Sequence, residues 1–558
     1  MRRSAFARFA TLALVAVVSA PFRVQLAAQS GAIVPPTDFA YVTIERLAEL
    51  GVLDSVIIGQ RPYSRGEIAR IARVGLAVME SGRRRARGLT DADAQLVGGL
   101  LRQLQARFGE TSESTPADER PSARLDGIGL TLTSTDAERR AFPGTQTGLT
   151  ETTIDPLATR RLGAPAPTGQ TLAFEAAAVA APASWITLQA RGRVEARQTR
   201  DAALSRTNGE ILLASLRARY RNAAVTIGRN ALAWSQGEGD GLFLASDAPA
   251  LDQLSLTGDH PFALPWILRV LGPTQATVIA ANLGASRVRS GSLLTGYKVS
   301  IKPDADVELG GTFLNHWGGA GARSSPFIER VIDNLPIIDV FRSHNYDDST
   351  KTLDVESDKS LGIDGRWRMS SLGGVLLTGE MLIDDFDHRR LGKLLTGYGS
   401  QTLGIVLPKL GSPALSMKVS VKHLGIVTYT HVELSNGMTS RGRLLGDELG
   451  PDAKSFGAQL RWTPSAALRV ALDGRTITYS KAEYESYYSD AARTLYHVRK
   501  KSFGGDERRD IAGASMLFHG DEAFVVSARV GAERIRNADF GGLTRHDYVA
   551  ELALRIGM

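Results

Sequence analysis

Glu380 and Asp384 are two acidic residues whose separation can be compared with the geometry of glycoside hydrolysis. They lie four residues apart on one predicted strand, so both side chains face the same side of the sheet. At ~3.3 Å per residue the two carboxylates would lie about 13 Å apart, whereas glycosidase carboxyl pairs lie about 5–9.5 Å apart. The spacing disfavours a hydrolytic pair, and the alternative is a structural pairing with arginines.

Asp384 also begins an acidic group that continues with Asp385, Asp387 and His388. These side chains could hold a cation, but acids bunched at a predicted loop mouth usually interact with water, and we predict no metal site. The chain has no cysteine, which excludes disulfides, thiolate metal sites and a cysteine nucleophile. The nine histidines show no recognisable spacing with Ser or Asp, so we predict no catalytic residues and no cofactor.

Trp234, His316 and Trp317 lie where predicted strands run into glycine-rich loops. Aromatic faces can bind the apolar faces of sugar rings, which makes these residues candidates for glycan contact. Alternatively, Trp234 and Trp317 belong to the interfacial aromatic girdle of a barrel or pack within their loops. The predicted ligand-binding residues are Arg229, Trp234, His316, Trp317, Glu380 and Asp384.

Arginines occur at every second position in the segments 189–197 and 216–221. In a strand this spacing gives one guanidinium-rich face and one apolar face. A soluble sheet buries its apolar face, whereas a membrane barrel turns that face to lipid and the polar face to the lumen. These arginines could attract an acidic glycan or, alternatively, pair with acids on neighbouring strands and fill the lumen. The predicted lumen-lining residues are Arg191, Arg193, Arg197, Arg217, Arg219 and Arg221.

Residues 1–28 are predicted to be a secretory signal peptide. A basic start precedes an apolar segment, and small residues near Ala28 offer a cleavage site. The leader contains four arginines and no acid, so its removal lowers the net charge of +7 by four, to +3, which weakens a nucleic-acid interpretation. The sequence after it has no run of about 18 apolar residues, so no transmembrane helix is predicted.

The remaining chain divides by its periodicity. Apolar residues at helical spacing predict a helical bundle over 35–110, residues 111–124 are a polar linker, and residues 125–558 have the period of strands. About eighteen strands are expected, one of them near 426–434. Short turns alternate with long polar segments, as in an up-and-down outer-membrane barrel. The long segments are expected at about 315–360, 384–400, 435–455, 476–510 and 532–545.

Three segments resemble the Wzi family of outer-membrane capsule assembly proteins. They are 224–246, which contains Arg229 and Trp234, then Leu-Asn-His-Trp-Gly-Gly over 314–319, and Gly-Glu-Met-Leu-Ile-Asp-Asp over 379–385. The resemblance covers about 40–558. It implies a monomeric barrel of about eighteen strands with a small periplasmic helical bundle. It also implies a lectin-like role in retaining capsular polysaccharide at the cell surface, without catalysis.

The predicted fold class is therefore all-β transmembrane, an outer-membrane β-barrel of about 18 antiparallel strands with a small N-terminal periplasmic α-helical bundle. The predicted function is non-enzymatic binding and anchoring of capsular or other surface polysaccharide. A porin-like channel for small or acidic solutes is the alternative, because it would share the strand pattern and the polar lumen. An outer-membrane hydrolase is a second alternative, disfavoured by the residue spacings. Expected partners are the polysaccharide and outer-membrane lipid, with no nucleic acid.

Overall fold

The structure is a computed structural model. It describes residues 30–80, 89–109, 121–137, 140–141, 153–154, 156–157, 168–199, 207–237, 241–322, 324–336, 356–384, 399–431, 434, 436–480, 482–488, 495–501, 505–520 and 524–557. The predicted signal peptide and residues 111–120 of the predicted linker lie outside the described residues. The same holds for Asp385, Asp387 and His388.

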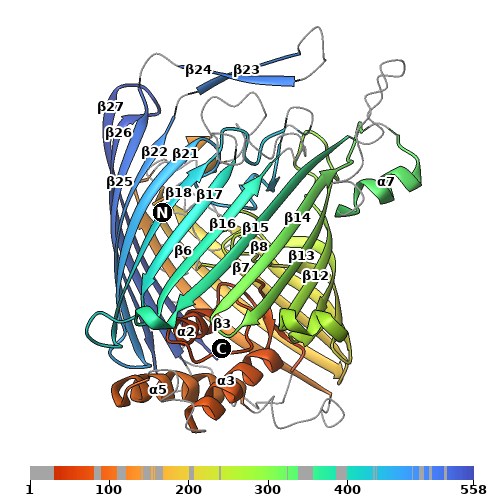
Figure 1. The fold of residues 1–558 in the computed structure, drawn as a ribbon. Coiled ribbons are helices and arrows are strands. Elements are labelled where there is room, and N and C mark those ends of the chain that lie inside the picture. The colour runs from red at the N-terminus through yellow and green to blue at the C-terminus, as the bar shows by residue number, and fades with distance from the viewer. Residues whose placement is uncertain are drawn as a thin grey trace.

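The described strands close into one antiparallel barrel, in which the last strand pairs with the first (Figure 1). This result confirms the predicted fold class. Its eighteen strands are β3 (Ser122–Thr135), β6 (Gly169–Ala183), β7 (Ile186–Gln198), β8 (Thr207–Tyr220), β9 (Ala223–Asn230), β10 (Leu251–Gly258), β12 (Pro273–Asn282), β13 (Leu293–Asp304), β14 (Val307–Trp317), β15 (Ser357–Met369), β16 (Val375–Ile383), β17 (Ser400–Leu407), β18 (Leu415–Leu424), β21 (Ala453–Trp462), β22 (Leu468–Tyr479), β25 (Glu507–His519), β26 (Phe524–Ala538) and β27 (Leu543–Ile556).

Smaller elements lie in the connections. They are β1 (Ile33–Val34), β2 (Tyr63–Ser64), β4 (Arg140–Ala141), β5 (Thr153–Ile154), β11 (Phe262–Ala263), β19 (Thr439–Ser440), β20 (Arg443–Leu444), β23 (Ala482–Tyr488), β24 (Leu495–Lys501), the 3₁₀ helices η4 (Trp266–Leu271) and η5 (Ser370–Leu372), and the helix α7 (Phe327–Asp333).

Alternation along each strand decides which side chains meet lipid. In β10, Leu254 and Leu256 point outward and are exposed, whereas Gln253 and Ser255 between them are buried in the barrel. A soluble sheet would show the reverse, so this pattern identifies a wall with a lipid-facing outer surface. Closure of the sheet leaves no unpaired strand edge.

The two ends of the barrel differ in their connections. At one end, here called the short-turn end, β8 joins β9 and β13 joins β14 through two residues each, whereas the connections at the other, long-loop end are mostly longer. This alternation was predicted. Two details differ from the prediction, because β3 already begins at Ser122 and the expected long segment 532–545 is a hairpin in which only residues 539–542 separate β26 from β27.

Three helices, α2 (Phe39–Glu49), α3 (Arg65–Glu80) and α5 (Asp91–Phe108), lie at the short-turn end (Figure 1). Their apolar faces form one buried cluster that includes Leu47, Ile71 and Leu101. Hydrogen bonds at their first turns fix where the helices begin, because Asp38 accepts from the backbone N–H of Ala40 at 2.9 Å. Within the described part of the chain, no helix combines the length and apolarity needed to cross a membrane.

Exposed aromatic side chains gather at the short-turn end of the wall. Trp185 lies in the turn between β6 and β7, Tyr220 ends β8, and Trp367 and Trp462 lie near the ends of β15 and β21. Aromatic rings of this kind form girdles at the two membrane interfaces of barrels. We call these four residues the aromatic belt, and it marks the membrane boundary on this side.

Candidate functional site

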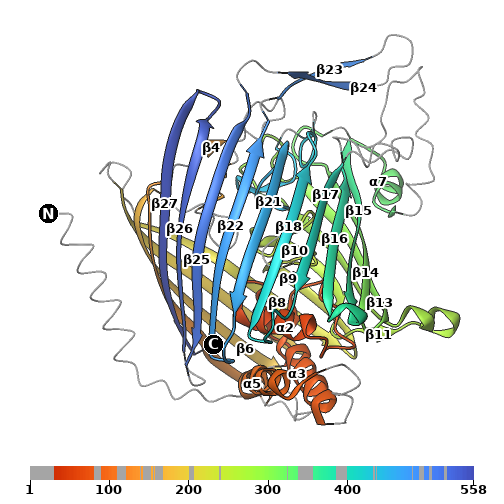
Figure 2. The same cartoon turned by 60° about the vertical axis from the view of Figure 1, so that its left-hand side comes forward.

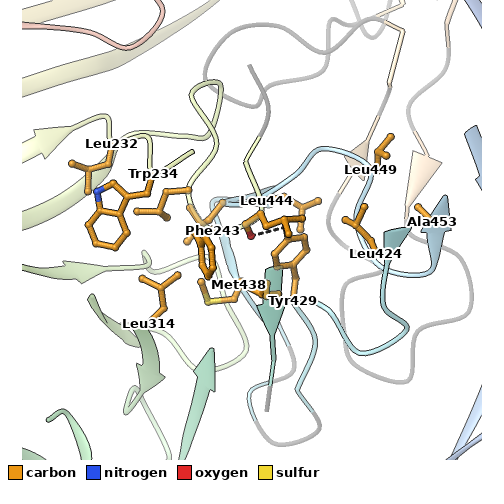
Figure 3. Close-up of a cluster of buried hydrophobic side chains, with 14 of the residues drawn as sticks. Leu232, Trp234, Phe243, Leu314, Leu424, Tyr429, Met438, Leu444, Leu449 and Ala453 are labelled. Atoms are coloured by element: carbon orange, nitrogen blue, oxygen red, sulfur yellow. Dashed lines mark hydrogen bonds between the residues drawn. The ribbon is translucent and has the colours of Figure 1, made fainter. Parts of the chain in front are cut away.

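The loop that joins β9 to β10 folds into the lumen. Trp234 and Phe243 in this loop are 1% and 0% exposed, and they pack with Leu314 of the wall in one apolar cluster (Figure 3). The sequence predicts that Trp234 contacts glycan, belongs to an aromatic girdle or packs within its loop. The indole packs within the inward-folded loop, as in the third alternative, and is enclosed by protein on the lumenal side.

Glu380 holds this loop in place. It lies on the lumenal face of β16, and its two carboxyl oxygens accept hydrogen bonds from the backbone N–H groups of Gln236 and Leu242, both at 2.8 Å. These N–H groups are buried and would otherwise lack partners, so the carboxyl group stabilises the inward conformation of the loop. The structural alternative for Glu380 expected arginine partners, whereas the structure gives it backbone amides.

Asp384 holds a second inward loop, which joins β18 to β21. One carboxyl oxygen accepts from the backbone N–H of Tyr429 and the other from the Ser360 hydroxyl, each at 2.5 Å. The Tyr429 hydroxyl then donates to the carbonyl of Leu242 at 2.8 Å, which ties the second loop to the first (Figure 3). We call the described residues of 231–250 and 425–452 the loop plug. The described residues 426–431 and 434 form no strand and belong to the plug, so the predicted strand at 426–434 is wrong there.

His316 lies under the loop plug at the end of β14 and is 0% exposed. Its Nε2 atom is 3.2 Å from a guanidinium nitrogen of Arg287, which also donates to the carbonyl of Gly437 at 2.9 Å. A guanidinium group can only donate, so Nε2 accepts and the imidazole is neutral. Burial lowers the pKa of Arg287 to about 10, which leaves it charged at neutral pH. His316 and Arg287 therefore fasten the plug to the wall.

Ion pairs occupy the lumen beside the plug. Arg193 lies 3.5 Å from Glu210, Arg217 lies 2.6 Å from Asp259, and Arg219 reaches the other oxygen of Asp259 at 3.7 Å. Such pairs are what the filler interpretation predicts. Other predicted lumen-lining residues are Arg197, which pairs with Glu195, and Arg191, which lies on the lumenal face of β7.

Arg221 departs from the prediction that it lines the lumen. It lies in the turn between β8 and β9 with a φ of 53°, and it is exposed. The guanidinium group stacks over the Tyr220 ring at 5.5 Å from the centroid. The alternation of arginines in the sequence extends one residue beyond the end of the strand. It therefore predicted a lumenal position for Arg221, which the turn places outside the lumen.

The helices fill the lumen from the short-turn end. Two acids on α2 form ion pairs with the barrel wall. Glu45 lies 3.1 Å from Arg366 of β15, and Glu49 lies 2.6 Å from Arg461 of β21. On the wall side, Glu308 of β14 accepts from the backbone N–H of Gly59 at 2.7 Å. We call this part of the chain, residues 30–80 and 89–109, the helical layer. Helical periodicity predicted the helices but not their entry into the barrel.

A small cavity lies inside the barrel beside the helical layer. It has a volume of about 30 Å³ and is lined by residues such as Gln60, Arg217 and Gln275. That volume holds on the order of one or two water molecules. In the part of the chain that the structure describes, two packed apolar clusters tied to the wall occlude the lumen from opposite ends, the loop plug at one and the helical layer at the other.

Arginines also gather where the wall meets the loop plug at the long-loop end. Arg229 donates to both carboxyl oxygens of Asp252 at 2.7 and 2.8 Å, whereas Arg441 and Arg443 of the plug lie 3.5 and 3.3 Å from Glu210. Burial and the neighbouring Arg229 lower the pKa of Arg441. We call Arg229, Arg441 and Arg443 the arginine rim. The ligand-binding residues predicted from the sequence include Arg229 and do not include Arg441 or Arg443.

Trp317 is the last residue of β14 and lies on the outward side of the wall. Its indole N–H donates to the Thr295 hydroxyl at 3.0 Å, and the side chain is partly exposed. This position suits the girdle interpretation and leaves part of the ring accessible. Among the described residues, no group of three or more His, Asp or Glu side chains is placed to hold a metal ion.

Comparison with known proteins gives two positive findings. The model of the family described as capsule assembly protein Wzi matches residues 139–545. In fold, the chain is similar to Wzi of Escherichia coli, described as an outer membrane protein involved in group 1 capsule assembly and a carbohydrate-binding β-barrel. The TM-score is 0.63 at 15% identity, covering 95% of this chain and 100% of that one. OprD of Pseudomonas aeruginosa has a TM-score of 0.42 at 9% identity, covering 79% and 98%. The search of curated proteins found no match.

Proposed function

This chain belongs to the Wzi family of capsule assembly proteins, and on that premise we propose that it binds capsular or another surface polysaccharide at the outer membrane. In this proposal the barrel anchors the glycan at the cell surface as a monomer and catalyses no reaction. The short-turn end with the helical layer faces the periplasm, and the long-loop end faces outward.

The occluded lumen is the observation that carries this proposal. A porin-like channel, the alternative, requires a continuous aqueous path, whereas here the loop plug and the helical layer are both packed apolar clusters. Each layer is tied to the wall by buried hydrogen bonds, such as those to Glu380 and Glu308. A closed barrel whose described plug loops are fixed by buried hydrogen bonds suits binding at its surface better than conduction.

The arginine rim is where we propose that the glycan is bound. Its three guanidinium groups lie beside Glu210 and Asp252 among the described residues. The buried cluster of the loop plug holds the loop that carries Arg441 and Arg443. Guanidinium groups bind carboxylates and hydroxyl groups through paired N–H donors. Trp317 remains a candidate for stacking on a sugar ring.

The candidate residues inside the barrel have a different role in this proposal. Trp234, His316, Glu380 and Asp384 are buried and support the loop plug, so they position the rim without contacting the glycan. The two carboxyl groups are occupied by hydrogen bonds from the plug and from Ser360, which supports a non-enzymatic role because neither is directed toward a substrate.

Replacing two rim arginines tests the site. We expect the double variant Arg441→Gln, Arg443→Gln to reduce the amount of polysaccharide retained by cells of the native host. Each charge-assisted hydrogen bond contributes about 1.5 kcal/mol or more, so the affinity should fall at least about tenfold per arginine. Retention is measured by staining washed cells for capsule and by assaying the polysaccharide released into the medium.

The matched control is Arg508→Gln. Arg508 is half exposed near the start of β25, at the same end of the barrel, and pairs with Asp510 at 3.1 Å. Retention should be unchanged in this variant, with both proteins present in the outer membrane in equal amounts. Equal retention in the rim variant and the control would contradict the proposed site, whereas full retention in a strain lacking the whole protein would contradict the proposed function.

A further inference from the structure

The connection between β10 and β12 is unusual among those at the short-turn end. It spans residues 259–272, whereas β8 and β9 are joined by residues 221–222 alone. The segment contains β11, which pairs with the start of β12 through Phe262 and Ala263, and then the 3₁₀ helix η4. Figure 2 shows the chain beyond β11 projecting sideways from the lower part of the wall. We call residues 262–271 the interfacial hairpin.

The hairpin presents apolar side chains that the protein does not cover. Trp266, Ile267 and Val270 are 92%, 84% and 72% exposed, and η4 has no buried residue. Single exposed apolar residues are common on protein surfaces. Several adjacent apolar side chains with such high exposure indicate a surface that contacts another molecule or a membrane.

The shape of the hairpin is built into the chain. Gly272 has a φ of +70°, and a Cβ atom there would lie 2.0 Å from the carbonyl oxygen of Lys302. Only glycine allows this return, which brings the chain from η4 directly back into β12. Pairing of β11 with β12 makes the hairpin an extension of the wall, so it does not turn into the lumen.

The surroundings of the hairpin indicate what covers it. On the outer face of the adjoining strands, Leu254 and Leu256 of β10 and Val278 of β12 are exposed toward lipid. The hairpin lies at the same end as the aromatic belt, so its apolar surface continues the lipid-facing wall at the level of the interface. Arg269, also exposed, lies within the same short helix. Interfacial segments combine aromatic and aliphatic side chains with basic residues in this way.

We propose that the interfacial hairpin inserts Trp266, Ile267 and Val270 into the phospholipid leaflet at the short-turn end, where Arg269 meets lipid phosphate. The apolar area of a few side chains is far below the roughly 1,200 Å² or more that a stable protein interface buries. No such minimum area applies to contact with the bilayer, because the bilayer already surrounds the wall and the hairpin only extends that contact.

A cysteine-free chain allows this insertion to be measured at single sites. Ile267→Cys is labelled with an environment-sensitive fluorophore, and the protein is refolded into nanodiscs of phosphatidylethanolamine and phosphatidylglycerol. We expect nitroxide groups near the lipid headgroup to quench the label more strongly than nitroxides in the middle of the acyl chain, and aqueous iodide to quench it weakly. Migration before and after heating shows that the barrel is folded.

Two labelled controls define the limits of the experiment. Leu254→Cys lies on the lipid-facing wall and should be quenched by nitroxide lipids but not by iodide. Ser465→Cys lies exposed in the turn between β21 and β22, at the same end as the hairpin, and should be quenched by iodide. An Ile267 label that behaves like the one at Ser465 would overturn the proposal and assign the patch to water or to a protein partner.

Because a fluorophore is itself apolar, an unlabelled measurement provides a second test. The emission of Trp266 is obtained as the difference between the chain and its Trp266→Phe variant, in nanodiscs with and without brominated lipid. We expect brominated lipid to reduce this difference by about twofold or more, as for an indole seated at the interface. A difference that brominated lipid does not change would contradict insertion, whatever the labelled site reports.

Discussion

Glu380 is the side chain whose removal should release the loop plug. The variant Glu380→Ala takes away the only carboxyl group that accepts from both Gln236 and Leu242 in the described structure. Both N–H groups would then be buried without a partner. The neighbouring variant Thr378→Ala, on the same lumenal face of β16, changes a side chain that makes no hydrogen bond to the described residues of the plug.

The size of the effect follows from the two hydrogen bonds. Leaving one buried N–H group unsatisfied costs about 1–3 kcal/mol, so the pair contributes about 2–6 kcal/mol to the inward conformation. Since about 1.4 kcal/mol corresponds to a factor of ten, the population with the loop displaced should rise roughly thirtyfold to twenty-thousandfold. Asp384 still holds the second loop, so the opening is expected to be transient.

Labelling of a cysteine placed in the plug measures this opening, because the helical layer still closes the other end of the lumen and a displaced plug alone need not conduct. In the cysteine-free chain Ser235→Cys is buried in the plug, so a membrane-impermeant maleimide should label it slowly, equally slowly with Thr378→Ala added, and much faster with Glu380→Ala added. A labelling rate that Glu380→Ala leaves unchanged in a barrel with heat-modifiable migration would refute the view that these hydrogen bonds keep the plug in place. Steady current through the unmodified protein in a planar bilayer would refute the occluded lumen itself.

Two further predictions concern stability. Trp234→Ala removes a fully buried indole from the plug cluster and should cost about 3–5 kcal/mol; the urea midpoint for loss of heat-modifiable migration should fall, and an unchanged midpoint would contradict the packing described. Burial opposes the charge on Asp38, but Arg107, donating at 2.9 Å to each carboxyl oxygen, outweighs it and holds the pKa of Asp38 well below its usual range. The contribution of this depressed pKa is present above about pH 4, the ordinary carboxyl range, and is lost as the pH falls. The difference in melting midpoint between the protein and Asp38→Asn should therefore shrink between neutral pH and pH 3, and a constant difference would contradict this assignment.

The barrel could be predicted from the sequence because alternation is a local signal. Strand residues such as Leu254 and Gln253 differ in polarity at neighbouring positions, and that contrast alone separates lipid from lumen. The lengths of the connections, which are also visible locally, predicted that the two ends of the barrel differ. The alternation gave a wrong position only at a strand end, where it continues into the turn that contains Arg221.

The loop plug could not be predicted in the same way. Its anchors are distant in sequence: Glu380 accepts from Gln236, 144 residues away, and Asp384 accepts from Tyr429. Residues 426–430 predict a strand because all of them are β-branched or aromatic. In a filled lumen, however, such residues can be buried against other loops as well as against lipid. No local pattern distinguishes these two environments, so the sequence left open whether Trp234 faces glycan, the membrane interface or the interior of its loop.

The most direct test of the central claim is binding of purified surface polysaccharide from the native host to the protein in nanodiscs, followed by biolayer interferometry. The account predicts saturable binding by the unmodified protein, weakened in the variant Arg441→Gln, Arg443→Gln and unchanged in Arg508→Gln. Absence of saturable binding by a folded, unmodified barrel would contradict the claim that this protein anchors polysaccharide at the cell surface.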